Sequence, residues 1–167
     1  MFETERLSMR RLTPDDLDWL LRMRTDPEVS RYLGTIPPKP EAVNARLRFY
    51  IDCYERYGYG MSGVEDKESG ALVGWGGLQP LEDSGETEVG YAFDKPFWGR
   101  GLATEVARAW LKYGFEHAGL SNIVAVAVRE NTASTHVMEK LGMRFERESL
   151  HYGSMCDLYR IKREEFH

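Results

Sequence analysis

The spacing of apolar residues along the chain predicts alternating helices and strands. Residues 103–115 place their apolar side chains three or four positions apart, which is one face of a helix, and Gly119 provides its end. Similar spacing predicts helices after Thr13 and over residues 41–57, and Asn131 caps a further helix over 132–141. β-Branched and alternating segments predict strands over residues 6–12, 61–64, 71–78, 86–93, 123–128, 144–152 and 155–161.

The order of these segments predicts an α/β fold. Segments 61–64 and 71–78 form a hairpin, and the last two strands pair across Gly153-Ser154. The β-branched run Ile123–Val128 is typical of a central strand that is buried on both faces. We therefore expect a mixed, mostly antiparallel sheet of about seven strands with helices on both faces. Because there is no linker, internal repeat or low-complexity segment, residues 1–167 are expected to form a single domain.

Composition narrows the class of protein. Of the 167 residues, 42% are apolar and 29% are charged, which is typical of a globular protein. No apolar run approaches the roughly 18 residues of a membrane span, so no membrane partner is expected. The net charge of −5 argues against a nucleic-acid partner. Cys53 and Cys156 form no ligand cluster with histidines, which predicts a cytoplasmic protein without a metal.

The candidate chemistry lies where a strand, a glycine loop and a helix follow one another. Residues 87–93 alternate as a strand, Gly99-Arg100-Gly101 form the loop, and the helix begins at once. A helix that opens from a glycine turn directs free N–H groups and its positive dipole end at one point, where a phosphate can bind. The loop has no GK[ST] ending, and Thr104 stands where a dinucleotide fingerprint has its third glycine. In isolation, an ordinary strand–turn–helix joint explains this segment equally well.

The segment resembles the pyrophosphate loop of the GNAT N-acetyltransferases. That pattern is Arg or Gln, two residues, Gly, one residue, then Gly or Ala, and Gly101 and Ala103 match it. Trp98 departs from the first position, as in the RimJ/RimL type of ribosomal-protein N-terminal acetyltransferase. The resemblance extends over segments 3–10, 26–29, 71–78, 88–91, 131–134 and 141–143. On these matches the sequence is identified as a member of the family, resembling its RimJ/RimL subgroup.

The resemblance implies an acyl-CoA N-acyltransferase fold that transfers acetyl directly from acetyl-CoA to a primary amine in a ternary complex. It implies that the fourth and fifth strands splay apart and that the pantetheine arm bonds to backbone in the gap. A backbone N–H near Phe93 would stabilise the oxyanion, and Ser134 would lie beside the sulfur. The residues implied to bind the co-substrate are Ala92, Phe93, Trp98, Gly99, Arg100, Gly101, Leu102, Ala103, Thr104, Asn131 and Ser134. From the residues alone, Asn131 and Ser134 are equally typical of a helix start.

Glu88 is the candidate base for the proton of the amine. Strand alternation places Thr87, Val89 and Tyr91 on one face and Glu86, Glu88 and Gly90 on the other, which faces either the acceptor or solvent. Weaker candidates are Glu86, Glu146 and Glu148, and two further side chains could assist without a spacing argument, Tyr91 and His151.

The acceptor stays open between a protein or peptide N-terminus and a small-molecule amine. The alternative function is a non-catalytic CoA-binding regulatory module, against which the presence of Glu88, Asn131 and Ser134 counts. Dimers are common in the RimJ/RimL subgroup, but nothing in the sequence specifies a homodimer.

Overall fold

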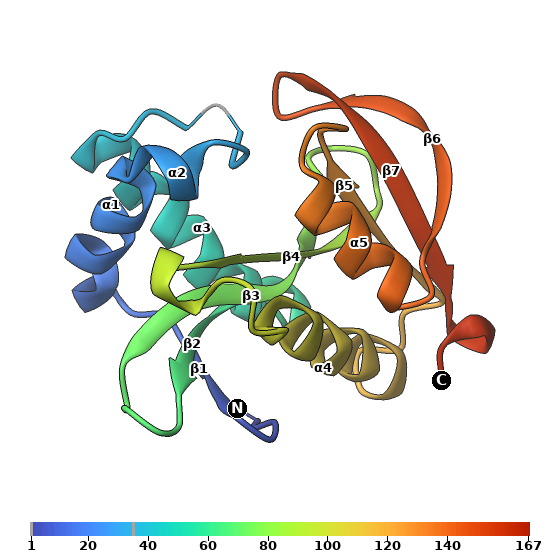
Figure 1. Ribbon diagram of the computed structural model, residues 1–167, viewed down its shortest axis with the longest axis horizontal. Helices are drawn as coiled ribbons and strands as arrows, with labels where there is room; N and C mark the ends of the chain where they lie inside the picture. The colour runs from blue at the N-terminus through green and yellow to red at the C-terminus, as the bar shows by residue number, and fades with distance from the viewer. Residues whose placement is uncertain (1, 35) are drawn as a thin grey trace.

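The computed structural model describes residues 2–34 and 36–167, and within them seven strands join in one sheet (Figure 1). The order across the sheet is β1-β2-β3-β4-β5-β7-β6. Only β4 and β5 are parallel neighbours, so the expected mixed, mostly antiparallel sheet is confirmed. The strands are Leu7–Arg11 (β1), Met61–Asp66 (β2), Leu72–Pro80 (β3), Thr87–Phe93 (β4), Asn122–Ala127 (β5), Arg144–His151 (β6) and Ser154–Lys162 (β7).

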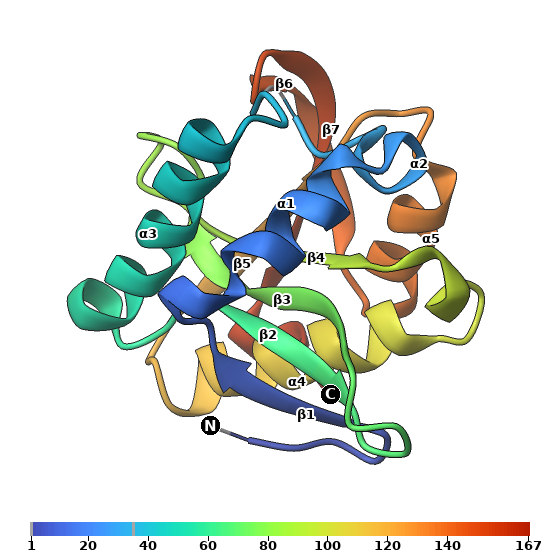
Figure 2. The same cartoon turned by 90° about the vertical axis from the view of Figure 1, so that its left-hand side faces the viewer.

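Helices cover both faces of the sheet (Figures 1 and 2). The α-helices are Leu17–Thr25 (α1), Pro27–Ser30 (α2), Pro40–Tyr57 (α3), Leu102–Glu116 (α4) and Thr132–Lys140 (α5), with 3-10 turns at Pro14–Asp16 (η1), Lys95–Phe97 (η2) and Arg163–Glu165 (η3). One apolar cluster joins α1, α2 and α3 to β2 and β3. A second joins α4 and α5 to the opposite face of β3, β4 and β5.

Most element boundaries match the sequence, with local corrections. The helix expected after Thr13 begins as the 3-10 turn η1, where the Asp16 carboxylate accepts the Thr13 N–H at 2.8 Å. The helix predicted over residues 41–57 begins one residue earlier, at Pro40. The β6–β7 turn consists of Tyr152 and Gly153, because His151 already pairs with Ser154.

The sheet opens between β4 and β5. These strands share one paired position, Glu88 with Val124. Over the same length β4 pairs with β3 at every residue from Thr87 to Phe93. From Val89 onward, β4 therefore has no strand partner on its β5 side among the described residues. We call this opening the β4–β5 gap, and Figure 1 shows β4 running between the two halves of the molecule.

Among the residues that the structure describes, no helix is both long and apolar enough to cross a membrane.

Candidate active site

A glycine loop forms the start of α4. Gly99 and Gly101 have φ values of 72° and 77°, a left-handed conformation that favours glycine. Gly101 is the N-cap residue of α4 and has no side chain that could accept a bond from the first N–H groups of the helix. Within the described residues, the N–H groups of Leu102, Ala103 and Thr104 have no hydrogen-bond acceptor. These free donors and the helix dipole suit the pyrophosphate of a CoA molecule.

Side chains of the N-terminal segment bond to this loop and to the first turn of α4. The Arg6 guanidinium donates to the carbonyl of Arg100 at 2.8 Å and bonds Glu105 in the first turn of α4 at 2.7 Å. Thr4 donates to the same carboxylate at 2.6 Å. Sequence reasoning missed this support, since the contacts with Glu105 join positions about a hundred residues apart. The Arg100 side chain is exposed, with its guanidinium 5.4 Å from the ring centre of Phe97.

The β3–β4 register decides which backbone groups face the gap. Asp94 N–H donates to Val73 C=O at 2.8 Å, which makes Phe93 a non-hydrogen-bonded position opposite Gly74. By alternation, the N–H and C=O groups of Ala92 bond to β3, whereas those of Tyr91 and Phe93 point into the gap. The register therefore favours Tyr91 and Phe93 as the backbone that can meet a ligand in the gap, and Ala92 as a co-substrate contact stays a prediction.

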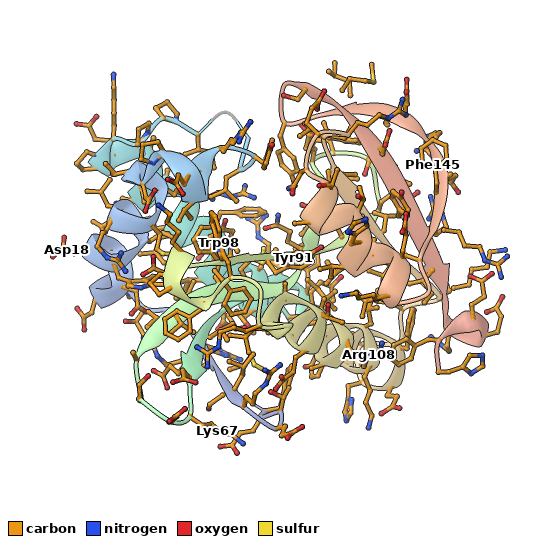
Figure 3. The ribbon with its side chains drawn as sticks, viewed as in Figure 1. Asp18, Lys67, Tyr91, Trp98, Arg108 and Phe145 are labelled. Atoms are coloured by element: carbon orange, nitrogen blue, oxygen red, sulfur yellow. The ribbon has the colours of Figure 1, made fainter. Side chains whose placement is uncertain are left out.

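The Trp98 side chain bonds the last residue of β4. Its indole Nε1–H donates to the carbonyl of Phe93 at 2.7 Å. Because this bond occupies the Phe93 carbonyl, the Phe93 N–H is the backbone group of this residue that is free to bond a ligand in the gap. Figure 3 shows Trp98 and Tyr91 side chains near the centre of the molecule, whereas Phe145 lies on the outer side of β6.

On the α5 side of β4, Tyr91 and Ser134 form a pair. The phenol and the Ser134 hydroxyl are 2.9 Å apart, and the phenol also donates to the Ser134 carbonyl at 3.2 Å. Burial raises the pKa of Tyr91 to about 12, so the phenol keeps its proton at neutral pH. Asn131 caps α5 by accepting the Ser134 N–H at 3.3 Å. Spacing along the chain assigned Tyr91 no definite role, because its partner lies 43 residues away.

On the opposite face of β4, Glu88 is 5% exposed and does not point at solvent. Its carboxylate accepts the Gln79 Nε2–H at 2.7 Å and the hydroxyl of Tyr152. Burial raises the pKa of Glu88, while the bonds from Tyr152 and Gln79 oppose that rise. A buried carboxyl with a raised pKa is suited to accept a proton near neutral pH.

The other glutamate candidates form ion pairs with arginines. Glu86 and Glu146 both bond Arg160, at 2.8 and 2.9 Å, and this guanidinium lowers the pKa of each carboxyl. Glu148 lies 2.6 Å from Arg129 and is exposed. Among these four carboxylates, Glu88 is the one that is buried beside the gap.

Tyr152 and Gln79, which both bond Glu88, are residues of this site that sequence reasoning missed. Tyr152 lies in the β6–β7 turn. It has a φ of 52°, a left-handed conformation that is strained for a bulky side chain. Its neighbour His151, a suggested helper, is buried and bonds Glu82 through Nδ1 at 2.9 Å. The turn thus holds an unfavourable backbone conformation where the Tyr152 hydroxyl meets the Glu88 carboxylate.

Residues 6–144 match the family model described as an acetyltransferase (GNAT) domain. The chain belongs to the GNAT acetyltransferase family. It is 30% identical over 150 residues to the uncharacterized N-acetyltransferase p20 of Bacillus licheniformis, covering 88% of this chain and 83% of that protein. A GNAT-family acetyltransferase structure from Bacillus anthracis superposes with a TM-score of 0.79 at 28% identity and covers 98% of each chain.

Two more distant structures share the fold of this GNAT acetyltransferase. A spermidine N-acetyltransferase from Vibrio cholerae, in complex with CoA and spermine, has a TM-score of 0.78 at 18% identity and covers 97% of this chain and 98% of its own. A ribosomal-protein-S5-alanine acetyltransferase from Vibrio fischeri has the same TM-score and identity and covers 99% and 98%. At 18% identity, these two likenesses show the shared fold alone. As a member of this family, the protein is an enzyme that acetylates amines with acetyl-CoA as the acyl donor. The family match does not support the alternative of a non-catalytic CoA-binding module.

Proposed function

We propose that this acetyltransferase transfers acetyl directly from acetyl-CoA to a primary amine within a ternary complex bound at the β4–β5 gap. The observation that carries the proposal is the placement of three different polar groups around β4. Glu88 lies on the α3 side, the Tyr91–Ser134 pair lies on the α5 side, and the free N–H groups of α4 lie at the end of the gap.

Glu88 serves as the proton acceptor in this proposal. An alkyl amine is almost wholly protonated at neutral pH and must lose a proton before its nitrogen can attack. The Glu88 carboxylate takes that proton, directly or through water. The amine nitrogen then bonds to the acyl carbon and loses its second proton to water, the carbon–sulfur bond breaks, and CoA leaves as a thiolate. The N–H of Phe93, which faces the gap, stabilises the oxygen that becomes negative during this step.

The Tyr91–Ser134 pair stabilises the leaving thiolate by hydrogen bonding. The pKa of Tyr91, about 12, is well above that of a thiol, about 8.5. Complete proton transfer from the phenol to the thiolate is therefore uphill, and the thiolate takes its proton from solvent after the bond has broken. The pair is instead a donor that stays protonated over the working pH range.

The test of the function is release of CoA thiol in the presence of acetyl-CoA and a panel of amines that includes peptide N-termini, amino acids and polyamines. Amine-dependent release with formation of the N-acetyl product is the expected result. Acetyl-CoA binding without release for any amine would contradict it.

A single domain, a cytoplasmic location and a homodimer stay predictions, and size-exclusion chromatography tests the last of these.

Ser134→Ala is expected to lower kcat by about 10- to 150-fold, the effect of losing one hydrogen bond to a charged group. Acetyl-CoA affinity should change little, because the contact strengthens as the sulfur becomes negative. Steady-state kinetics with calorimetric measurement of acetyl-CoA binding checks this. Thr135→Ala is the matched control, since the Thr135 hydroxyl donates to the carbonyl of Thr132 in its own helix at 3.0 Å. Equal kcat in the two variants would reduce Ser134 to a helix-start residue.

Tyr152→Phe is expected to move the acid limb of the kcat/KM profile to higher pH. The Tyr152 hydroxyl donates to the Glu88 carboxylate and lowers its pKa. Removing this donor raises that pKa further, so the carboxyl stays protonated up to a higher pH and activity at acidic pH falls. A pH profile of kcat/KM measures the shift. An unchanged acid limb would mean that Tyr152 does not control the proton on Glu88.

A further inference from the structure

On the α3 side of the sheet, one buried and one half-buried arginine have no carboxylate partner among the described residues. Arg24 of α1 is 6% exposed and donates to the Tyr50 hydroxyl at 2.9 Å. Arg46 of α3 is half-buried and donates to the Gln79 Oε1 at 3.2 Å. In both, the Nε atom is buried and has no hydrogen-bond partner among the described residues.

Other arginines of the chain are neutralised more completely, although they are more exposed. Arg10 bonds Asp16 at 2.9 Å and Glu65 at 2.7 Å. Arg160 bonds two carboxylates in the same way. For Arg24 and Arg46, within residues 2–34 and 36–167, the structure places a phenol, a carboxamide and aromatic rings at contact distance, but no carboxylate. Against the effect of its burial, the two guanidinium groups between them lower the pKa of the Tyr50 phenol.

The charges of this region do not balance. Arg24 and Arg46 flank the phenol of Tyr50 and contribute two positive charges. Glu88 contributes at most one negative charge, and the Gln79 carboxamide separates it from Arg46. Buried charge is unfavourable unless an opposite charge and hydrogen bonds compensate it. A bound anion would supply the missing negative charge.

Arg46 and Tyr152 are the more accessible residues of this region. They are half-buried, whereas Arg24, Tyr50, Gln79 and Glu88 are buried. The Gln79 carboxamide lies between the Arg46 guanidinium and the Glu88 carboxylate and bonds both.

We propose that the acceptor is an amine that also carries a carboxylate, with the carboxylate held by Arg46 and the amine directed toward Glu88. The proposal rests on the proposed function and names the substrate class of the same site. A guanidinium matches the planar geometry of a carboxylate and can donate two parallel hydrogen bonds to it. Arg24 adds a second positive charge behind Tyr50 without touching the ligand. A polyamine would instead bring further positive charge toward both arginines.

Matched acceptors test the proposal. Amino acids with α- or β-amines are compared with their carboxamides and with spermidine, and kcat/KM is expressed per free amine because the amine pKa values differ. We expect wild-type enzyme to prefer the carboxylate over its carboxamide by at least about tenfold, which is the expected scale for one charge-assisted contact. Arg46→Gln should abolish this preference while acetyl-CoA affinity stays unchanged.

Arg48→Gln is the matched control, because Arg48 is an exposed arginine on the same helix. It should keep the wild-type preference. Equal or faster turnover of carboxamides or spermidine by the wild type would overturn the proposal, and so would identical behaviour of Arg46→Gln and Arg48→Gln.

A binding measurement separates this inference from the proposed function. If no amine is turned over, calorimetry with the CoA-bound protein compares an N-acetyl amino acid with its carboxamide. Carboxylate-dependent binding that is lost in Arg46→Gln would support the anion site although transfer had failed. Equal binding of the two compounds, or binding of neither, would overturn it.

Discussion

Gly101→Glu is expected to abolish acetyl-CoA binding. Gly101 is the N-cap of α4 with a φ of 77°, and it is followed by the N–H groups of Leu102, Ala103 and Thr104 that face no protein acceptor in the described structure. A glutamate there would place its negative charge where the pyrophosphate of acetyl-CoA is expected. Isothermal calorimetry should therefore detect no binding at acetyl-CoA concentrations that saturate the wild type.

The substitution also introduces a side chain at a left-handed residue, and a matched variant separates the two effects. Gly85 in the β3–β4 loop has a φ of 81°, is exposed, and has open space where a Cβ would lie. Gly85→Glu brings the same charge and a comparable backbone strain to another part of the sheet. It should bind acetyl-CoA as the wild type does. Unchanged affinity in folded Gly101→Glu would remove the phosphate role of this loop.

The sequence predicted the parts of the molecule that depend on neighbours along the chain. The glycine loop and the amphipathic face of α4 are local patterns, and the alternation of β4 correctly separated the face of Glu88 from that of Tyr91. The apolar run of β5 is also a local pattern, since a strand covered on both faces needs apolar side chains on both. One face packs under α4 and α5, and Val124 on the other face packs against Leu81 and Leu158.

Other parts of the site depend on contacts that no local pattern carries. Tyr152 meets Glu88 from 64 residues away, and it occupies a left-handed turn position where Asn, Asp or Gly is the usual signal. Which backbone groups of β4 face the gap follows from the β3–β4 register, which alternation within one strand does not define. The pairing of Arg24 with Tyr50 likewise requires the packing of α1 against α3. Tertiary placement, rather than residue type, decides these contacts.

Glu88→Gln is expected to lower kcat/KM by about 10²- to 10⁴-fold near neutral pH, the range for loss of a general base. A glutamine at this position keeps an oxygen that can accept the bonds from Gln79 and Tyr152, so the local structure should survive. The variant cannot take a proton from the amine. Its residual activity should rise with pH toward the pKa of the amine itself, where the free amine forms without help.

The pH profile of the wild type supplies the decisive comparison. Because burial raises the pKa of Glu88, the carboxyl gains its proton as the pH falls through a value above the ordinary carboxyl range, and kcat/KM should fall with it. That limb should be missing in Glu88→Gln and present in Glu148→Gln, whose side chain is exposed and lies on β6. Kinetics of kcat and KM from about pH 6 to 10 measure both variants. A raised KM with an unchanged kcat profile would make Glu88 a residue that only binds the acceptor, and wild-type kinetics at every pH would exclude it from both roles.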